Sequence, residues 1–361
     1  MPLLYGRFWT RGELLSRVGD MSQVASIRPS TLTEGRSRGC RLLDFNVGDG
    51  MRFGVMSDRC MDIPYLEYRG VPLVWHSRNG IVAPQYVAYH ESEWLRSFAG
   101  GLVATCGLTQ VGQPCVDGDE HLGLHGRIGG APAEELSIQQ HWVGDDYELS
   151  ARGTMRETRV FGEDLVLTRT ISSHAGSKRI FLHDRVENLG EQTCPFMILY
   201  HCNAGYPLLG PEARLIVRDE RIEPKDEHSR QGLANHTRFE PPQEGWSEQN
   251  YWHSVKPDAN GVCSAAIVND GLRVDGLRGL GFAIRWKRDQ LWNLVQWKQM
   301  GEGDYVSAIE PANCHTLGRV KERELGTLEH LAPGEVREFD LEFLVLAGEQ
   351  NIREFEARLP S

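Results

Sequence analysis

Three short segments could carry acid–base chemistry, because each sets ionisable side chains beside an apolar run of the kind that forms a buried strand. Histidine gives and takes protons near neutral pH, and a half-buried carboxylate can act as a general base. The three segments are residues 123–127 (GLHGR), 199–206 (LYHCNAGY) and 307–313 (SAIEPAN). We predict that they converge on one site.

Glu310 is the candidate base. It follows the apolar pair Ala308 and Ile309 and precedes Pro311, which cannot donate to the hydrogen-bond ladder of a central strand. We therefore expect Glu310 to lie half buried at a strand end, where burial raises its pKa toward the working pH. The alternative is a structural glutamate that caps a turn or pairs with an arginine such as Arg319.

His201 is the candidate acid. It follows the apolar residues 196–200, so its imidazole should enter a region that holds little water. Asn203 and Tyr206 add hydrogen-bonding groups beside it. The alternative is a core histidine whose ring is satisfied by a backbone carbonyl.

His125 and Arg127 belong to a glycine-rich stretch, and its small residues would let a ligand approach the backbone closely. The same composition also suits a flexible loop without a binding role.

The elements that would position these residues are strands. From about residue 24 the chain alternates short apolar runs with Gly, Asp, Asn and Pro, at intervals of roughly ten residues. We predict an all-β fold, a large antiparallel β-sandwich of two packed sheets. The clearest predicted strands are residues 40–47, 51–56, 70–75, 147–153, 165–172, 180–188, 196–202, 282–287, 291–297 and 339–346.

The chain shows no repeat or convincing linker, so we expect one domain over residues 1–361. Residues 1–23 should form an N-terminal arm with a short helix at 10–18, capped by Thr10 with Glu13 three residues on. The polar residues 223–261 should be an insertion or lid, because strand-like sequence resumes on both sides.

Composition narrows the class of function. Hydrophobic residues make up 40% and charged residues 25%, which is typical of a soluble globular protein. The net charge of −11 and the lack of a basic stripe argue against a nucleic-acid partner. The chain has no apolar run of about 18 residues, so we expect no membrane partner.

Eight cysteines are scattered without a C-x-x-C pair, which predicts reduced thiols and a cytoplasmic protein. No H-x-H, H-E-x-x-H or C-x-x-C spacing is present, and we therefore expect no metal site.

The three segments, in this order, resemble motifs of the aldose 1-epimerase (galactose mutarotase-like) family. The family's Leu-His-Gly is similar to residues 124–126, its second histidine after an Asn-X-Gly turn is similar to His201 after residues 188–190, and its Glu-Pro is similar to Glu310 and Pro311. Residues 57–63, 98–107 and 200–207 resemble a functionally uncharacterised branch. The second motif departs from the family pattern, since Tyr200 precedes His201 and Asn203 and Tyr206 are shifted.

The resemblance implies a cofactor-independent isomerase that interconverts the α and β anomers of a free or modified sugar. Glu310 would take the proton of the anomeric hydroxyl while His201 protonates the ring oxygen. His125 would bind the sugar near that oxygen, and Arg127 would help to orient either the sugar or Glu310. The implied partner is a small-molecule carbohydrate, and the protein would be a monomer or homodimer.

Further substrate-binding candidates come from two segments. In residues 292–298, alternation puts Trp292, Leu294, Gln296 and Lys298 on one face of a strand, and that face could meet sugar hydroxyls. An exposed structural strand is the alternative for Gln296 and Lys298. Arg59 and Asp62, in residues 57–63, could contact a sugar or form a salt bridge at a turn.

Two other classes of function stay open from the sequence. The fold could serve as a non-catalytic carbohydrate-binding or regulatory module, because a fold does not determine a function. An isomerase or epimerase that acts at another sugar carbon would use similar acid and base groups.

Overall fold

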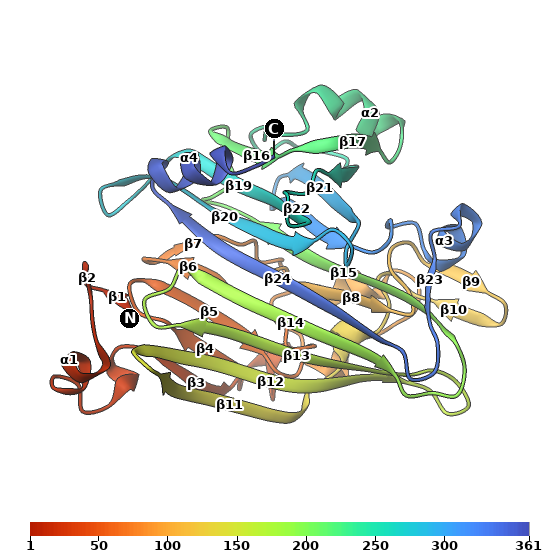
Figure 1. Ribbon diagram of the computed structural model, residues 1–361. Coiled ribbons are helices and arrows are strands. Elements are labelled where there is room, and N and C mark those ends of the chain that lie inside the picture. Colours follow the sequence, from red (N-terminus) through yellow and green to blue (C-terminus); the bar gives the residue numbers. More distant parts are fainter. Residues whose placement is uncertain (361) are drawn as a thin grey trace.

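The computed structural model describes residues 1–360, and strands are its main secondary structure (Figure 1). Two large antiparallel sheets pack against each other, with a smaller five-stranded sheet beside them. The predicted all-β sandwich is therefore confirmed.

The first large sheet has eight strands, and alternate residues along them are buried, as expected for strands with one face on the core. In sheet order the strands are β11 (Glu134–Val143), β12 (Asp146–Thr158), β13 (Asp164–His174), β14 (Arg179–Asn188), β24 (Val336–Ala347), β20 (Leu277–Lys287), β19 (Val262–Val274) and β16 (Ala213–Val217).

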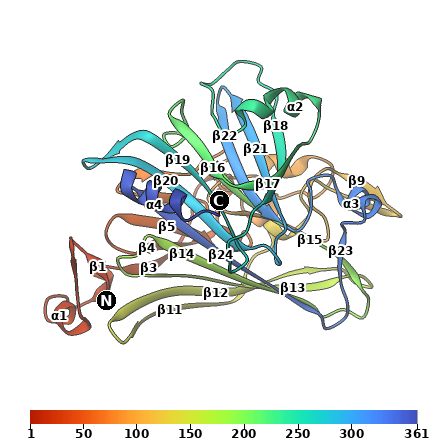
Figure 2. The ribbon, with the colours of Figure 1, turned by 45° about the horizontal axis from the view of Figure 1, so that its top comes forward.

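The second large sheet carries the candidate site. Along its main path lie β17 (Asp219–Pro224), β18 (Gln249–Val255), β21 (Asn293–Gly301), β22 (Asp304–Ala312), β15 (Cys194–Ala204) and β23 (Glu329–Leu331), and β8 (Ala104–Leu108) also pairs with β15. Figure 2 shows β18, β21 and β22 fanning away from the strands of the eight-stranded sheet.

The remaining strands lie in the N-terminal third of the chain. The five-stranded sheet holds β3 (Ser26–Thr31), β4 (Arg41–Asn46), β5 (Met51–Met56), β6 (Leu66–Tyr68) and β7 (Val71–Pro72). Two hairpins are formed by β1 (Leu3–Leu4) with β2 (Arg7–Phe8) and by β9 (Cys115–Asp117) with β10 (Glu120–Leu122).

Helices are few and short. The α-helices are α1 (Arg11–Leu15), α2 (Glu227–Gly232), α3 (Arg319–Leu325) and α4 (Glu349–Ala357), and the 3-10 turns are η1 (Met21–Gln23), η2 (Gly35–Ser37), η3 (Pro84–Tyr86), η4 (Glu93–Arg96), η5 (Ile128–Gly130) and η6 (Leu233–Asn235). Among the described residues, no helix combines the length and the hydropathy needed to cross a membrane.

β15 is buried on both faces, and each face packs against a different apolar cluster. Phe196 and Tyr200 point into the main core, where their rings lie 5.8 Å and 6.4 Å from the ring of Phe339 on β24. Met197 and Leu199 point the other way, into a smaller apolar cluster that also contains Trp94 and Phe98. His201 continues this second face, because side chains alternate along a strand.

The N-terminal helix confirms its predicted cap. Thr10 accepts a hydrogen bond from the backbone of Glu13, and the Glu13 side chain accepts one from the backbone of Thr10. The helix ends at Leu15 and not near residue 18. The predicted strand at residues 70–75 is only partly formed: Val71 and Pro72 make up β7, and Val74 forms an isolated bridge with Ala204.

Residues 223–261 do not form a detached lid. They contain the end of β17, α2, η6 and all of β18, which pairs with both β17 and β21 inside the second sheet. The segment is therefore part of the wall that carries the candidate site, and α2 projects from it at the edge of the molecule (Figure 1).

Candidate active site

A cavity of about 200 Å³ opens on the second sheet, over the face of β15 that carries His201. Its walls come from β15, β18, β21, β22, η4 and the loop around residue 125. The lining residues are Ser92, Trp94, Leu95, Phe98, Gly112, Gln113, Leu124, His125, His201, Lys225, Glu248, Asn250, Trp297, Glu310 and Thr316. Three predicted site residues, His125, His201 and Glu310, thus meet in one cavity.

His201 and Glu310 face each other across neighbouring strands. β15 and β22 pair antiparallel with Cys202 opposite Ile309, which sets His201 opposite Glu310. His201 Nε2 lies 3.2 Å from Glu310 Oε1, and the two residues are only 5% and 1% exposed. Among the described residues, His201 Nδ1 has no hydrogen-bond partner, and Glu310 Oε1 has no contact of this kind besides the ion-pair contact with His201. Both buried atoms can therefore accept or donate a hydrogen bond to a ligand.

β22 differs slightly from the prediction around Glu310. The strand continues through Pro311 to Ala312, so Glu310 lies two residues before the strand end. Its predicted alternative partner, Arg319, lies elsewhere and donates to Asp117 and Glu120.

Burial shifts both members of the pair toward their neutral forms. Burial raises the pKa of Glu310 well above its usual value, with help from the charge of Glu248 and against the charge of Lys225. Burial lowers the pKa of His201 well below its usual value, and His125 adds to that effect. At intermediate pH the pair therefore holds one proton, which can sit on either residue without changing the net charge of the cavity.

His125 is placed by a tight turn. Its φ is 60° and that of Gly126 is 74°, and a Cβ on Gly126 would lie 2.4 Å from the carbonyl oxygens of Gly107 and Gln110. The glycine in the Leu-His-Gly motif is thus required by this close approach. The backbone N–H of His125 donates to the carbonyl of Gly112 at 3.0 Å, which fixes the turn over the cavity.

The His125 side chain is a neutral, available polar group. Burial lowers the pKa of His125 to about 3, so the ring is uncharged at physiological pH. Its Nδ1 is buried and has no hydrogen-bond partner among the described residues. The His125 and His201 rings lie 6.0 Å apart, with the ring of Trp94 4.6 Å from His125.

Aromatic rings form the apolar side of the cavity. Phe98 and Trp297 lie 4.9 Å and 5.4 Å from the His201 ring, and Trp94 stacks on Phe98 at 4.2 Å. Such walls exclude water from the acid–base pair and offer flat faces to the C–H groups of a ligand.

Sequence reasoning missed the polar rim of the cavity. Lys225, Glu248 and Asn250 all come from residues 223–261, which carry no motif around them. Glu248 Oε2 accepts a hydrogen bond from Trp297 Nε1 at 2.8 Å, and the Lys225 N–H donates to the Asn250 carbonyl at 3.0 Å. The only available signal was the density of polar and aromatic residues in that segment.

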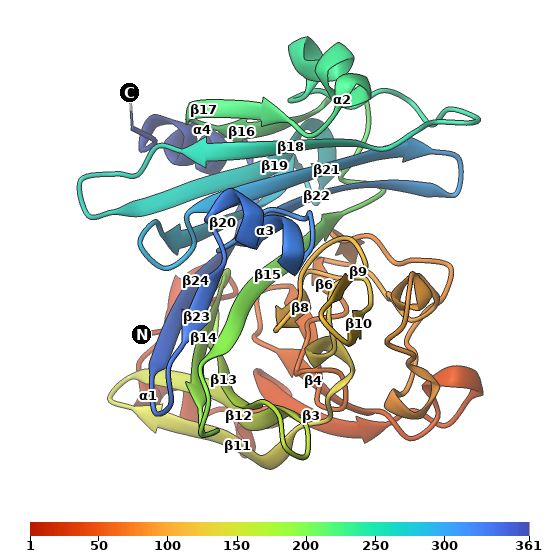
Figure 3. The same ribbon diagram turned by 90° about the vertical axis from the view of Figure 1, so that its right-hand side faces the viewer.

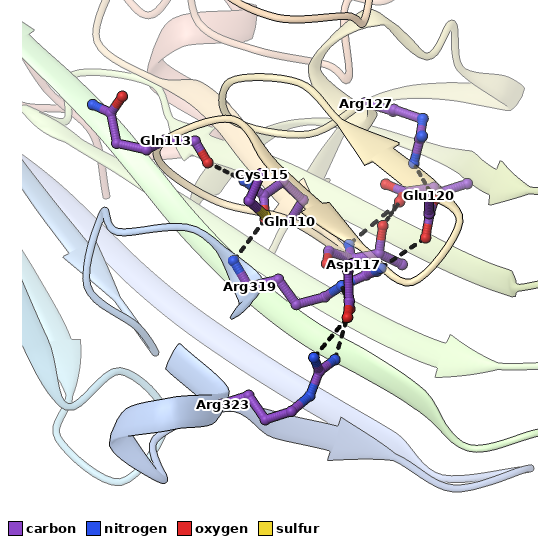
Figure 4. Close-up of polar contacts among 10 residues, drawn as sticks. Gln110, Gln113, Cys115, Asp117, Glu120, Arg127, Arg319 and Arg323 are labelled. Atoms are coloured by element: carbon purple, nitrogen blue, oxygen red, sulfur yellow. Dashed lines mark hydrogen bonds and ion pairs between the residues drawn. The ribbon is translucent and has the colours of Figure 1, made fainter. Parts of the chain in front are cut away.

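Arg127 lies outside the cavity lining. It contacts Glu120 at 3.2 Å and joins a charged cluster in which Arg319 binds Asp117 and Glu120 while Arg323 binds Asp117 (Figure 4). The cluster ties the β9–β10 hairpin to α3, and the Arg319 N–H also donates to Gln110 Oε1. Arg127 thus supports the rim of the cavity, and the predicted direct contact with a ligand is not supported.

Asn203 and Tyr206 also lie outside the lining. Asn203 is fully buried, and its Nδ2 donates to the carbonyls of Gly101 and His201. Tyr206 is 78% exposed at the surface beyond the end of β15. Asn203 therefore helps to hold the strand that carries His201, and Tyr206 has no contact with the cavity.

Gln296 and Lys298 are on the opposite face of β21 from the cavity. Trp297, between them, lines the cavity, so the two neighbours point away from it. Gln296 donates to the His236 carbonyl, and Lys298 pairs with Glu240 at 2.6 Å. The predicted alternation along β21 is present, and the face that carries Gln296 and Lys298 lies away from this cavity.

Arg59 and Asp62 are buried beneath the cavity. Arg59 donates to the carbonyls of Gly129 and Val82. Asp62 accepts hydrogen bonds from Thr105 and from Arg169. Both serve the packing below the site and do not line it.

Arg169 is the centre of that buried network. It is fully buried and binds Asp184 through Nε and an Nη, at 2.8 Å and 2.6 Å. It also donates to Thr105 Oγ1 on β8, and Asp184 accepts a hydrogen bond from Tyr200 on β15. The network thus ties β8 to β15, the strand that carries His201.

Residues 37–345 match the family described as "Domain of unknown function (DUF4432)". The chain belongs to this family. No curated protein matches the DUF4432 chain.

Solved structures give the fold relationship. The DUF4432 chain is similar to a structure described as a "putative aldose 1-epimerase" from Klebsiella pneumoniae, with 25% identity, 92% of this chain and 86% of that chain covered, and a TM-score of 0.86. It is also similar to a galactose mutarotase-like protein from Clostridium acetobutylicum (13% identity, 90% and 99% covered, TM-score 0.52). A third similar structure is a galactose 1-epimerase from Lactobacillus acidophilus (13% identity, 90% of this chain and 100% of that chain covered, TM-score 0.52).

The resemblance to the aldose 1-epimerase (galactose mutarotase-like) superfamily is thereby confirmed at the level of the fold. The DUF4432 match agrees with a functionally uncharacterised branch.

Proposed function

We propose that this DUF4432 protein is an aldose 1-epimerase that interconverts the anomers of a free or modified monosaccharide. The observation that carries the proposal is the buried pair of His201 and Glu310, 3.2 Å apart at the base of a cavity walled by aromatic rings. The anomeric hydroxyl and the ring oxygen of a sugar are bonded to the same carbon. An acid and a base that serve both oxygens must therefore lie side by side.

In the proposed reaction, the Glu310 carboxylate takes the proton of the anomeric hydroxyl while protonated His201 donates a proton to the ring oxygen. The bond between the anomeric carbon and the ring oxygen breaks, and the former hydroxyl becomes a carbonyl. Rotation about the adjacent carbon–carbon bond presents the other face of the carbonyl. Ring closure then returns both protons, so the pair ends with the single proton it started with.

The cavity supports this chemistry in two further ways. Buried, neutral His125 offers its unpartnered Nδ1 to a sugar hydroxyl. The aromatic walls keep water away from the pair, which strengthens each hydrogen bond inside the cavity.

The direct test is anomer exchange in freshly dissolved sugars, followed by polarimetry or by NMR exchange spectroscopy. Glu310→Gln and His201→Ala should each slow catalysed exchange by about 10²–10⁴-fold, the usual contribution of one proton-transfer group. Exposed residues of the same types provide matched controls, Glu338→Gln and His330→Ala, which should exchange anomers at the wild-type rate. Wild-type rates in Glu310→Gln and His201→Ala would overturn the assignment.

The same NMR experiment in D₂O separates the proposal from the alternatives. Ring opening leaves every C–H bond intact, whereas epimerisation through an enediol replaces a carbon-bound hydrogen by deuterium. A binding module would bind the sugar and accelerate neither process.

A further inference from the structure

A second cluster of ionisable side chains lies behind the cavity wall. It consists of Asp219 on β17, His236 just after η6 and His253 on β18, from strands that run side by side in Figure 3. One potential ligand atom from each residue lies within 4.8 Å of the other two. On the neighbouring strand β21, Gln296 also points into the cluster, and Trp297, the next residue, points into the cavity.

Hydrogen bonds fix the proton positions on His253. Gln296 Nε2 donates to the His236 carbonyl at 2.7 Å, so the Gln296 Oε1 atom must face His253. That oxygen lies 3.2 Å from His253 Nε2, which must therefore carry the hydrogen. His253 Nδ1 then faces Asp219 Oδ2 at 3.0 Å. In neutral imidazole this nitrogen holds a lone pair, so two acceptors face each other unless a cation lies between them.

The other two residues complete a set of free lone pairs. His236 Nδ1 lies 2.8 Å from the Leu233 carbonyl and donates to it, which leaves His236 Nε2 as an acceptor. A backbone carbonyl on the second ring nitrogen is the usual way in which a metal-binding histidine is oriented. Asp219 Oδ1 is buried and has no hydrogen-bond partner among the described residues.

The local charge also favours a cation. Lys298 is the nearby basic side chain, but its ammonium pairs with Glu240 at 2.6 Å. Apart from His253, no basic side chain among the described residues forms an ion pair with the Asp219 carboxylate.

We propose that Asp219, His236 and His253 bind a divalent first-row transition metal ion, with zinc as the simplest probe. The ligands would be His253 Nδ1, His236 Nε2 and an oxygen of Asp219. Zinc bonds to nitrogen and oxygen of about 2.0–2.2 Å place tetrahedral ligand atoms about 3.3 Å apart. The Asp219 and His253 atoms, 3.0 Å apart, are close to that spacing, and the His236 atom, within 4.8 Å of both, would have to move by up to about 1.5 Å toward the ion.

The site would have a structural role distinct from the proposed catalysis. It joins β17 and β18 to the loop at His236, and these elements belong to the same wall that supplies Lys225, Glu248 and Asn250 to the cavity. Short sequence motifs could not reveal this site, because successive ligands are 17 residues apart in the chain.

The test uses the full chain without a histidine tag, stripped with a chelator and then titrated with zinc chloride. Equilibrium dialysis with elemental analysis should find one zinc ion per wild-type chain. Asp219→Asn and His236→Ala should each weaken zinc binding more than about 10-fold, since even outer contacts of a metal site contribute 10–100-fold. The control is His228→Ala, an exposed histidine on α2 in the same segment, which should bind zinc as wild type does.

Thermal unfolding gives an independent readout. Zinc should raise the midpoint of wild type and of His228→Ala but not that of Asp219→Asn, whose side chain keeps its shape and loses its charge. Wild type that binds no more zinc than His236→Ala would overturn the proposal, and His253 would then be an imidazolium ion paired with Asp219.

Discussion

Glu310 lies between two cavity charges of opposite sign, and each should move the pH dependence of catalysis in its own direction. Glu248 raises the pKa of Glu310 and Lys225 lowers it, both after the larger effect of burial. In the proposed reaction the pair of Glu310 and His201 holds one proton, so the alkaline side of the pH profile should report the loss of that proton.

We predict opposite shifts of the alkaline limb in two variants. Glu248→Gln removes a negative charge and should move the alkaline limb of kcat to lower pH, while its amide oxygen still accepts from Trp297. Lys225→Gln removes a positive charge and should move the limb to higher pH. Shifts of the same sign in both variants would contradict the charge argument, whatever happens to KM.

His125 makes a prediction about stability and pH. Its pKa is about 3 in the folded protein and 6.5 in an ordinary environment, so the unfolded chain binds a proton that the folded chain refuses. Between these values the free energy of unfolding should fall as the pH falls, by up to about 1.4 kcal/mol per pH unit from this residue. His201 acts in the same direction, since burial lowers its pKa too.

The check is urea denaturation of His125→Asn between pH 6.5 and pH 4.5. Asparagine tolerates the positive φ of this position and does not titrate in this range, so the variant should lose less stability on acidification than wild type. An exposed histidine, His330→Asn, should keep the wild-type slope. An unchanged slope in His125→Asn would show that the ring is not held neutral.

At the level of single residues, the sequence predicted which histidines and glutamate meet in the cavity better than it predicted the polar residues of the rim. His125, His201 and Glu310 stand in short motifs beside apolar runs, and the structure brings all three to one cavity. Lys225, Glu248 and Asn250 could not be found in this way, because tertiary contacts and not local spacing decide which polar residues of a long segment reach a cavity.

At the level of strands, we expect the buried ion network around Arg169 to stabilise the packing of β8 and β15 more than any ion pair on the surface does. Arg169 is completely buried between Asp62 and Asp184, so its removal leaves two buried carboxylates without their cation. Breaking a buried ion pair in this way typically costs about 3–5 kcal/mol.

Arg169→Met should therefore lower the free energy of unfolding by about 3–5 kcal/mol in chemical denaturation. The matched control is Arg52→Met on β5, where a half-exposed arginine pairs with Asp44 at 2.6 Å and should contribute less than about 1 kcal/mol. Equal losses in the two variants would rule out the buried network as a support for the strand that carries His201.

The elements also show where pattern reasoning stops. Period-two alternation correctly placed Gln296 and Lys298 on one face of β21, yet that face lies behind the cavity. When a strand is buried on both sides, the polarity of its residues does not show which side faces a ligand. The packing of the sheet determines that side. Likewise the apolar run at residues 70–75 has strand composition but forms only the two-residue strand β7 and one isolated bridge at Val74.

At the scale of the whole molecule, sugar binding should be visible as added stability. A ligand that binds only the folded state stabilises it by RT ln(1 + [L]/Kd), which is about 2.7 kcal/mol at a concentration of 100 Kd. We predict that a panel of monosaccharides raises the unfolding temperature of wild type for a few stereoisomers only. Thermal-shift measurements in parallel with Trp94→Ala, which removes part of the aromatic wall, should show a smaller rise. A uniform rise for all sugars in both proteins would indicate a solvent effect and no specific site.

The strand β15 pairs with strands that lie far from it in the sequence. It pairs with β8, where Tyr200 lies opposite Thr105, 95 residues earlier in the chain, and with β22, which begins at Asp304. During synthesis, β15 therefore leaves the ribosome long before the strand that brings Glu310. Until β22 is synthesised, the largely apolar strand β15 has one edge without a hydrogen-bonded neighbour. Unpaired strand edges of this kind can pair with other chains and cause aggregation. Fragments that end before residue 304 should therefore aggregate unless chaperones bind them, in addition to being inactive.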